Sequence, residues 1–186
     1  RPAASEPLYV VVPRESTDVF RTATVENPLD SPLLPGPVDV YLRGAFLLTS
    51  RFELTAPRGK LAVGLGVEQG IKVARNTRYR EESAGLMGGA LLLRHQILVE
   101  LRSNLARPAP LEVRERIPVT REDEDDVQVS VHTVRPAWEE WQQELARPSE
   151  ARMRGGYRWR VTLEPGAREE LRADYDVKIP AKQELA

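Results

Sequence analysis

The strongest constraint on this chain is an alternation of apolar and polar side chains with a period of two. Apolar residues recur at every second position over residues 157–163 and again, almost without interruption, over residues 171–179. Successive side chains of a β-strand point to opposite faces, so this period is typical of a strand with one buried face. The pattern predicts an all-β, antiparallel, immunoglobulin-like β-sandwich, in which two apolar surfaces pack together.

The same alternation places strands along the whole chain. They are expected over residues 19–25, 38–42, 46–54, 61–67, 71–75, 91–101, 111–117, 127–131, 157–163 and 171–179. Each half holds enough strands for a small sandwich, which favours a first unit over residues 1–80 and a second over residues 81–186. The alternative is one merged sandwich that mixes strands from both halves.

One segment departs from the strand pattern and predicts a short helix over residues 136–147. Trp138 and Trp141 are three positions apart, and acidic residues follow Pro136 in the first turn. Proline is favoured at the first helical position and acids near the helix N-terminus, while Pro148 would end the helix. The two tryptophans would then share one face.

Composition excludes several classes of function. The 186 residues hold 27 Lys and Arg against 28 Asp and Glu, with two His and no Cys. A nearly neutral chain lacks the basic excess of a nucleic-acid-binding protein, so no nucleic-acid partner is expected. The absence of Cys removes disulfides and thiolate ligands, and we expect no metal and no cofactor. No apolar run reaches the ~20 residues that span a bilayer, so we expect no membrane span in this segment.

Several motifs made of turns and strands resemble a known family. They are Leu-Leu-Pro-Gly-Pro-Val at 33–38, Gly-Val-Glu at 66–68, Ile-Lys-Val at 71–73, Leu-Arg-Ser-Asn at 101–104, Val-Arg-Glu-Arg-Ile-Pro-Val at 113–119, Trp-Arg-Val-Thr-Leu-Glu-Pro-Gly at 159–166 and Asp-Tyr-Asp-Val-Lys-Ile-Pro at 174–180. From about Phe20 onward the chain resembles the carboxy-terminal domain of unknown function of mucoidy inhibitor A-like bacterial proteins. It departs from that family at Glu68, where Asp is frequent, and in the insertion-like segment at residues 136–148.

This resemblance implies an all-β module of bacterial envelope-associated proteins. It carries no established catalytic residue, so none is transferred. Family members usually have an amino-terminal domain and a helical segment ahead of this one, and the chain begins at Arg1 without Met, as a fragment of a longer protein would. The compartment is unknown from the sequence itself; only the resemblance favours the cell envelope or periplasm.

Two charged features have ordinary structural interpretations. The acidic run Glu122–Asp126 lacks the alternating ligands and central Gly of a calcium loop, and is interpreted as a solvated hairpin tip. His95 and His132 each lie alone inside an expected strand, without partners at metal-ligand spacing and without a Gly-x-Ser-x-Gly motif. Both are interpreted as strand histidines.

The aromatic residues are the best candidates for a binding surface. Trp159 is expected in the core, because aromatic residues at strand period are usually buried. Trp138 and Trp141, in the insertion-like segment, are the candidate contacts for a ligand or partner.

We therefore expect a non-catalytic structural or interaction module that contacts a protein partner or other domains of its parent chain. One alternative is a carbohydrate-binding module that uses the exposed aromatics, with an envelope polysaccharide as ligand. The second alternative is a hydrolase with paired carboxylates. No acid stands in a recognisable apolar context, which favours the non-catalytic interpretation.

Overall fold

A computed structural model describes residues 5–42, 44–84, 90–120, 127–142 and 154–180. These residues form strands and connecting turns, with no helix among them. The strands are β1 (Ser5–Val12), β2 (Ser16–Glu26), β3 (Gly36–Leu42), β4 (Ala45–Phe52), β5 (Lys60–Val67), β6 (Ile71–Ala84), β7 (Ala90–Ser103), β8 (Ala109–Arg116), β9 (Gln128–Arg135), β10 (Glu139–Glu140), β11 (Gly156–Leu163) and β12 (Arg168–Pro180).

The strands are arranged in two main sheets and a separate hairpin. One sheet has the order β10-β11-β8-β1-β2-β5, the second has the order β6-β7-β12-β9, and β3 pairs with β4 alone. The strand pairs of the described residues are antiparallel except for β1 with β8. The predicted all-β sandwich is therefore confirmed, and β1 is a strand that the alternation did not predict.

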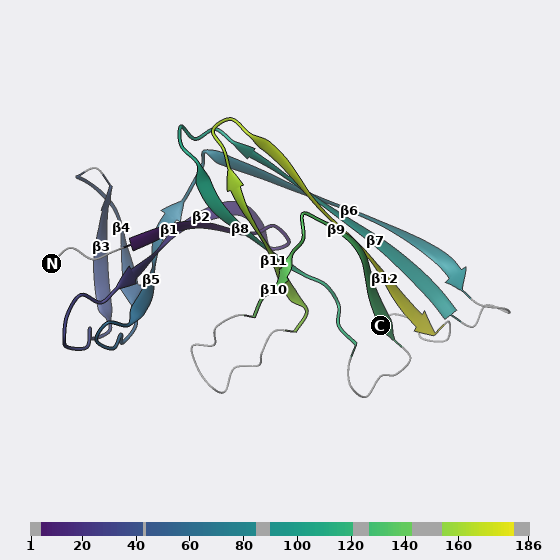
Figure 1. Cartoon of the computed structure of the whole chain (residues 1–186), viewed down its shortest axis with the longest axis horizontal. Helices are drawn as coiled ribbons and strands as arrows, with labels where there is room; N and C mark the ends of the chain where they lie inside the picture. The colour runs from purple at the N-terminus through teal and green to yellow at the C-terminus, as the bar shows by residue number, and fades with distance from the viewer. Residues whose placement is uncertain (1–4, 43, 85–89, 121–126, 143–153, 181–186) are drawn as a thin grey trace.

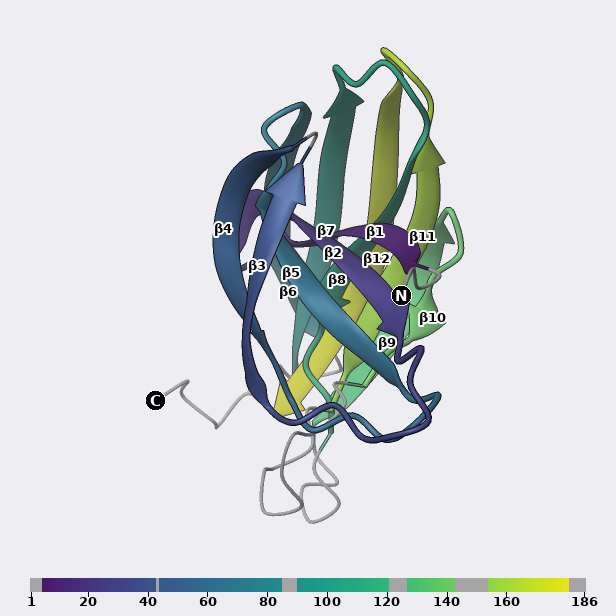
Figure 2. The same ribbon diagram turned by 90° about the vertical axis from the view of Figure 1, so that its left-hand side faces the viewer.

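The two sheets overlap along part of their length (Figure 1). The far ends of β6, β7 and β12 extend beyond the six-stranded sheet, while the β3–β4 hairpin lies at the opposite end of the molecule. Figure 2 shows the hairpin from that end, in front of β5 and β2. The long strands stay in register throughout: β6 pairs with β7 from Ile71 with Ser103 to Ala84 with Ala90.

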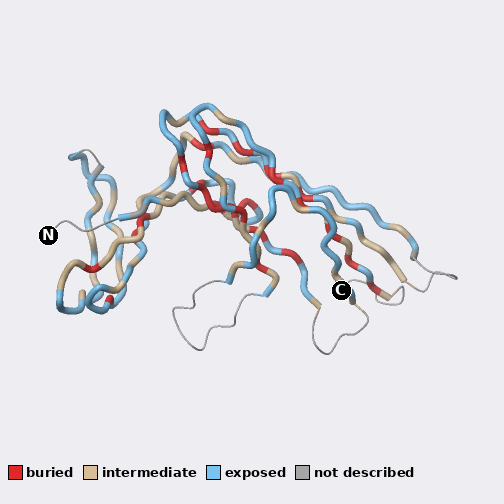
Figure 3. The backbone as a smooth tube through the Cα atoms, viewed as in Figure 1, coloured by how far each residue is buried: buried red, intermediate tan, exposed pale blue. Residues whose placement is uncertain are grey.

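The core lies where the sheets face each other, as the buried positions in Figure 3 show. Leu111, Val113 and Trp159 come from the six-stranded sheet, and Val99 and Leu171 come from the four-stranded one; all five are at most 1% exposed. Full burial of one such aliphatic side chain contributes about 2 kcal/mol. These residues belong to the alternating series, so the same period that defines the strands also defines the core.

The predicted helix at 136–147 is wrong. Residues 136–142 contain the short strand β10, which pairs antiparallel with β11, and residues 143–147 lie outside the described part of the chain. The signals for a helix were local, namely a proline, acids and two rings at helical spacing. Packing of Trp138 on the rings of β11 and pairing of β10 with that strand override this preference.

Both sheets contain strands from both expected units. β1 pairs with β8, and β6 pairs with β7 across the position that would separate residues 1–80 from residues 81–186. The division into two units, or their merger into one, stays a prediction. Within the described residues, no helix has the length and apolar character needed to cross a membrane.

Candidate functional site

Trp138 lies on the core side of the six-stranded sheet. Its ring stacks on Tyr157 with centroids 4.4 Å apart and tilts against Trp159 at 4.9 Å. The buried Trp159 in turn donates a hydrogen bond from Nε1 to the carbonyl oxygen of Pro136, at 2.8 Å. These contacts fasten the segment before β10 to the core, so Trp138 has a structural role in addition to its half-buried surface.

Trp141 lies on the opposite, outer side of the same sheet. The guanidinium carbon of Arg114 sits 4.2 Å from the centre of its ring, which is cation–π geometry. Arg114 pairs with Arg158 across β8 and β11, on the face that alternates with the core positions. On a helix the two candidate tryptophans would share one face. Here they lie on opposite sides of the sheet.

The buried carboxylate of Glu112 forms ion pairs with three arginines, including the Arg114 that contacts Trp141. Glu112 is 2% exposed. Its oxygens lie 2.7 Å from Arg114 Nε, 3.1 Å from Arg158 Nη1 and 3.5 Å from Arg160 Nε. A buried charge is costly unless it is paired and hydrogen-bonded, and here the guanidinium groups supply that compensation.

A second carboxylate at the sheet edge completes the cluster. Glu139 Oε1 of β10 lies 2.8 Å from Arg158 Nε and 3.1 Å from Arg160 Nε. We call the set Glu112, Arg114, Glu139, Trp141, Arg158 and Arg160 the outer network. Its three arginines and two glutamates leave one positive charge in excess. The side chain of Arg160 is 59% exposed, so it presents positive charge at the surface.

The chemistry of the outer network is that of recognition. Arginine guanidinium groups bind carboxylates through paired N–H donors, and arginine and tryptophan are enriched where protein interfaces concentrate their binding energy. Glu112 is surrounded by guanidinium groups, so its oxygens are occupied by pairing. The network is consequently a rigid, slightly basic surface with one ring and one exposed guanidinium.

A second ionic cluster lies inside the sandwich. Glu115 is 3% exposed, and its Oε2 accepts a hydrogen bond from Arg75 Nε at 2.7 Å, which joins β8 to β6 of the other sheet. Burial raises the pKa of the nearby Tyr175 phenol above its ordinary value, and the Glu115 charge adds to this shift. Arg14 and Arg75 partly oppose it.

Comparison with known proteins assigns this chain to a family. The model of the family described as "Domain of unknown function (DUF4139)" matches residues 6–181. The chain belongs to this family. It is also similar to "Protein F37C4.5" of Caenorhabditis elegans, with 27% identity over 128 residues, which cover 67% of this chain and 22% of that protein. The chain thus corresponds to less than a quarter of the length of this relative, and no solved structure matches it.

The histidines of this domain lie in strands, as interpreted from the sequence. His95 stacks on Tyr175, with ring centroids 4.8 Å apart, and lies 6.1 Å from the ring of Tyr79. Burial lowers the pKa of His95, and the charge of Asp176 opposes part of that shift. His132 Nε2 lies 2.8 Å from Asp176 Oδ2. The acidic run Glu122–Asp126 falls outside the described residues.

The buried acids are functional candidates that sequence reasoning missed. The sequence singled out no acid in an apolar context, whereas Glu115 shares the buried face of its strand with Leu111 and Val113. The position of Glu115 on the apolar side of this alternation was the signal in the sequence that could have identified it. Glu112 gave no such signal, because it alternates with the apolar positions as a solvated residue would.

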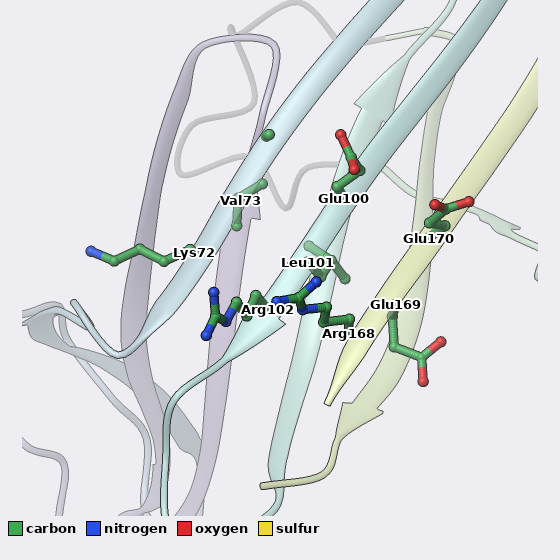
Figure 4. A pocket seen from close by; sticks show the side chains of 9 residues that line it. Lys72, Val73, Glu100, Leu101, Arg102, Arg168, Glu169 and Glu170 are labelled. Carbon is green, nitrogen blue, oxygen red and sulfur yellow. The ribbon is translucent and has the colours of Figure 1, made fainter. Parts of the chain in front are cut away.

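A shallow charged groove crosses the outer face of the four-stranded sheet (Figure 4). Lys72, Arg102 and Arg168 stand directly opposite one another on β6, β7 and β12, and none has an acidic partner among the described residues. The adjacent row holds Glu100 and Glu170 on β7 and β12. The groove therefore presents both signs of charge. The described part of the chain contains no cluster of three or more His, Asp or Glu placed to hold a metal ion.

Proposed function

We propose that this domain is a non-catalytic interaction module and that the outer network is its contact surface for another protein or for another domain of its parent chain. The observation that carries the proposal is the buried Glu112, which pairs with three arginines, one of which, Arg114, lies over the ring of Trp141. The resemblance to envelope-associated bacterial proteins suggests the setting in which such a contact would be used.

Preorganisation is the physical reason for choosing this surface. Fixing a flexible side chain at an interface costs about 0.5–1.5 kcal/mol, which weakens binding. Arg158 and Arg114 are already fixed by ion pairs, so they can meet a partner without much of that cost. The excess positive charge and the exposed head of Arg160 favour a partner surface that presents a carboxylate next to an apolar group.

The carbohydrate alternative receives less support from the geometry. A sugar platform built from Trp138 and Trp141 would need both rings on one surface, whereas one packs on the core rings and the other lies over Arg114. The hydrolase alternative would need a carboxylate open to substrate. The two most buried acids, Glu112 and Glu115, are instead both occupied by arginines.

The test compares two matched double variants of the immobilised domain. Trp141→Ala with Arg160→Ala removes the half-buried ring and the exposed arginine side chain of the outer network. Tyr79→Ala with Arg51→Ala removes an exposed ring and an exposed arginine elsewhere. Proteins retained from an extract of the source cells are quantified by mass spectrometry.

We expect a specific partner to be retained by the wild type and by the control variant, and to be lost from the outer-network variant. Folding of all three proteins is checked by thermal denaturation. Equal retention by both variants, or stronger loss from the control, would contradict the proposal.

A further inference from the structure

We infer that a cavity at the hairpin end of the domain binds a small amphipathic carboxylate, a molecule with an apolar body and an acidic head. This inference is independent of the proposed contact surface. The cavity has a volume of about 410 Å³ and lies between the β3–β4 hairpin and strands β1, β2 and β5. Small-molecule sites usually have volumes of about 300–1,000 Å³. Figure 2 shows the β3–β4 hairpin, which forms one wall of the cavity, in front of β5 and β2.

The walls of the cavity are mostly apolar and come from several elements. Leu8 of β1, Val40 and Leu47 of the hairpin and Leu65 of β5 contribute aliphatic side chains, and Pro110 closes one side. Such walls remove the apolar part of a ligand from water, which contributes about 25 cal/mol per Å² of buried apolar area. The body of the ligand is therefore expected to be aliphatic.

Arg21 makes the cavity selective for an anion. Its Nε atom is buried and has no hydrogen-bond partner among the described residues. The remaining contacts of the guanidinium are long: Nη2 lies 3.4 Å from the Val67 carbonyl oxygen, and Nη1 lies 3.9 Å from Glu68 Oε2. Buried polar groups in proteins are usually satisfied, so this weakly paired guanidinium favours an acceptor. Nε itself is closed to solvent, so a ligand in the cavity would accept hydrogen bonds from the Nη groups of this side chain, which is 21% exposed.

The surrounding charges favour a carboxylate over a neutral head. Glu68 uses its Oε1 to accept a hydrogen bond from the Gly70 amide at 2.8 Å, so it only partly neutralises Arg21. Arg107 also lines the cavity and has no acidic partner among the described residues. The guanidiniums of Arg21 and Arg107 and the carboxylate of Glu68 together leave one positive charge in excess. A carboxylate matches the paired N–H donors of a guanidinium in geometry and in charge.

Gly66 lies next to Arg21, just outside the residues that line the cavity. Gly66 has a φ of +80°, and a Cβ atom built there would meet Leu48 Cδ2 at 3.1 Å and Arg21 Nη2 at 4.0 Å. A side chain at this position would be strained by the backbone and would press on Leu48. Glycine at residue 66 thus avoids strain in the part of β5 next to the Arg21 guanidinium.

The probe for this site is decanoate, with decanol as the uncharged match of the same chain length. Binding is measured by isothermal titration calorimetry below the aggregation concentration of each probe. Amide chemical shifts of Thr22, Leu47 and Leu65 show whether the probe enters the cavity. We expect saturable decanoate binding that shifts these amides, and decanol binding that is weaker by at least about tenfold, as one lost charged hydrogen bond would produce.

Three variants locate the determinants. Arg107→Gln removes the rim charge from an exposed side chain and should weaken decanoate binding about fivefold or more without changing thermal stability. Leu47→Glu places a repelling carboxylate in the wall and should abolish binding. Arg51→Gln, an exposed arginine of β4 outside the cavity, should bind as the wild type does.

Arg21→Gln should also lose binding, but Arg21 contacts β5, so its thermal stability is measured in parallel. The inference is overturned if the wild type shows no saturable decanoate binding, if decanol binds equally well, or if Arg107→Gln and Leu47→Glu both bind as Arg51→Gln does. Shifts confined to amides far from the cavity would also overturn it.

Discussion

Arg75 of β6 and Glu115 of β8 connect the two sheets of the sandwich through an ion pair, with Nε and Oε2 2.7 Å apart. The Glu115 side chain is fully buried, and that of Arg75 is 17% exposed. Glu115 also accepts a hydrogen bond from the backbone N–H of Arg116 at 3.0 Å. The pair thus places two ionised groups next to a core that is otherwise dominated by aliphatic and aromatic side chains. Each group would lose its compensating charge if the other were removed.

Removal of the acidic partner should destabilise the domain strongly. Glu115→Gln leaves the Arg75 guanidinium without its carboxylate, and breaking a buried ion pair costs roughly 3 kcal/mol or more. The free energy of unfolding is measured by urea denaturation. Glu82→Gln is the matched control, because its pair with Arg94 is substantially exposed and should contribute less than about 1 kcal/mol.

The double variant Arg75→Met with Glu115→Leu separates the cost of an orphaned charge from the contribution of the pair. Replacement of a buried ion pair by apolar residues of similar volume is often neutral or stabilising. We expect the double variant to recover most of the stability lost in Glu115→Gln. A double variant that is less stable than the single one would show that the pair itself stabilises the fold.

His95 makes the stability of the domain sensitive to mild acid. Burial lowers its pKa in the folded state below the ordinary value of 6.5, so the unfolded chain binds a proton more readily than the folded one. The neutral ring stabilises the fold above pH 6.5, and this contribution is lost as the pH falls from 6.5 through the lower folded pKa.

The check is a series of urea denaturations between pH 8 and pH 5. We expect the wild type to lose more stability than His95→Gln over this range, because glutamine does not titrate. His132→Gln is the control for the second histidine, which is half exposed beside Asp176. An identical pH profile for the wild type and His95→Gln would contradict the assignment.

Glu112 should matter more than the other carboxylate of the outer network. Glu112→Gln removes the charge that three guanidiniums share, and the loss of buried charge-assisted hydrogen bonds is expected to cost about 2 kcal/mol. Glu139→Gln changes a half-exposed side chain and should cost less than about 1 kcal/mol. Thermal denaturation of both variants gives the comparison, and a larger loss for Glu139→Gln would refute this ranking.

The strands and core could be predicted from the sequence because side-chain period and burial are local properties. The alternation over residues 171–179 matches the buried positions of β12 from Leu171 to Ile179. Strand β1 was missed because its apolar run, Leu8 to Val12, is short and lacks a clear period. Its place in the sheet comes from pairing with β2, the next strand, and with β8, which lies far from β1 in the sequence.

The candidate site could be predicted only in part. Trp141 and Trp138 were identified as contact candidates, but their surfaces depend on β10 pairing with β11, and local signals favoured a helix there. The arginines around Glu112 come from β8 and β11, so their convergence depends on a strand register that no spacing along the chain reveals. The same applies to Arg75 and Glu115, which lie 40 residues apart.

The row of cations in the groove of Figure 4 should oppose folding. Arg102 stands between Lys72 and Arg168, and like charges directly opposite each other on neighbouring strands destabilise a sheet. Arg102→Glu replaces this repulsion with two attractions and should stabilise the domain by roughly 0.5 kcal/mol at low salt. Raising the salt concentration should reduce the gain, because these side chains are exposed and screened. A loss of stability at low salt would show that the row is not repulsive.

The two tryptophans of the β10 segment should separate in their effect on stability. Trp138→Ala removes a ring that packs on Tyr157 and Trp159, and a half-buried ring in this position should cost about 2 kcal/mol, somewhat less than a fully buried one. Trp141→Ala removes mainly the contact with Arg114 and should cost under about 1 kcal/mol. Urea denaturation of each single variant measures the two losses. Equal losses would mean that Trp141 is also part of the core and is not available to the proposed contact surface.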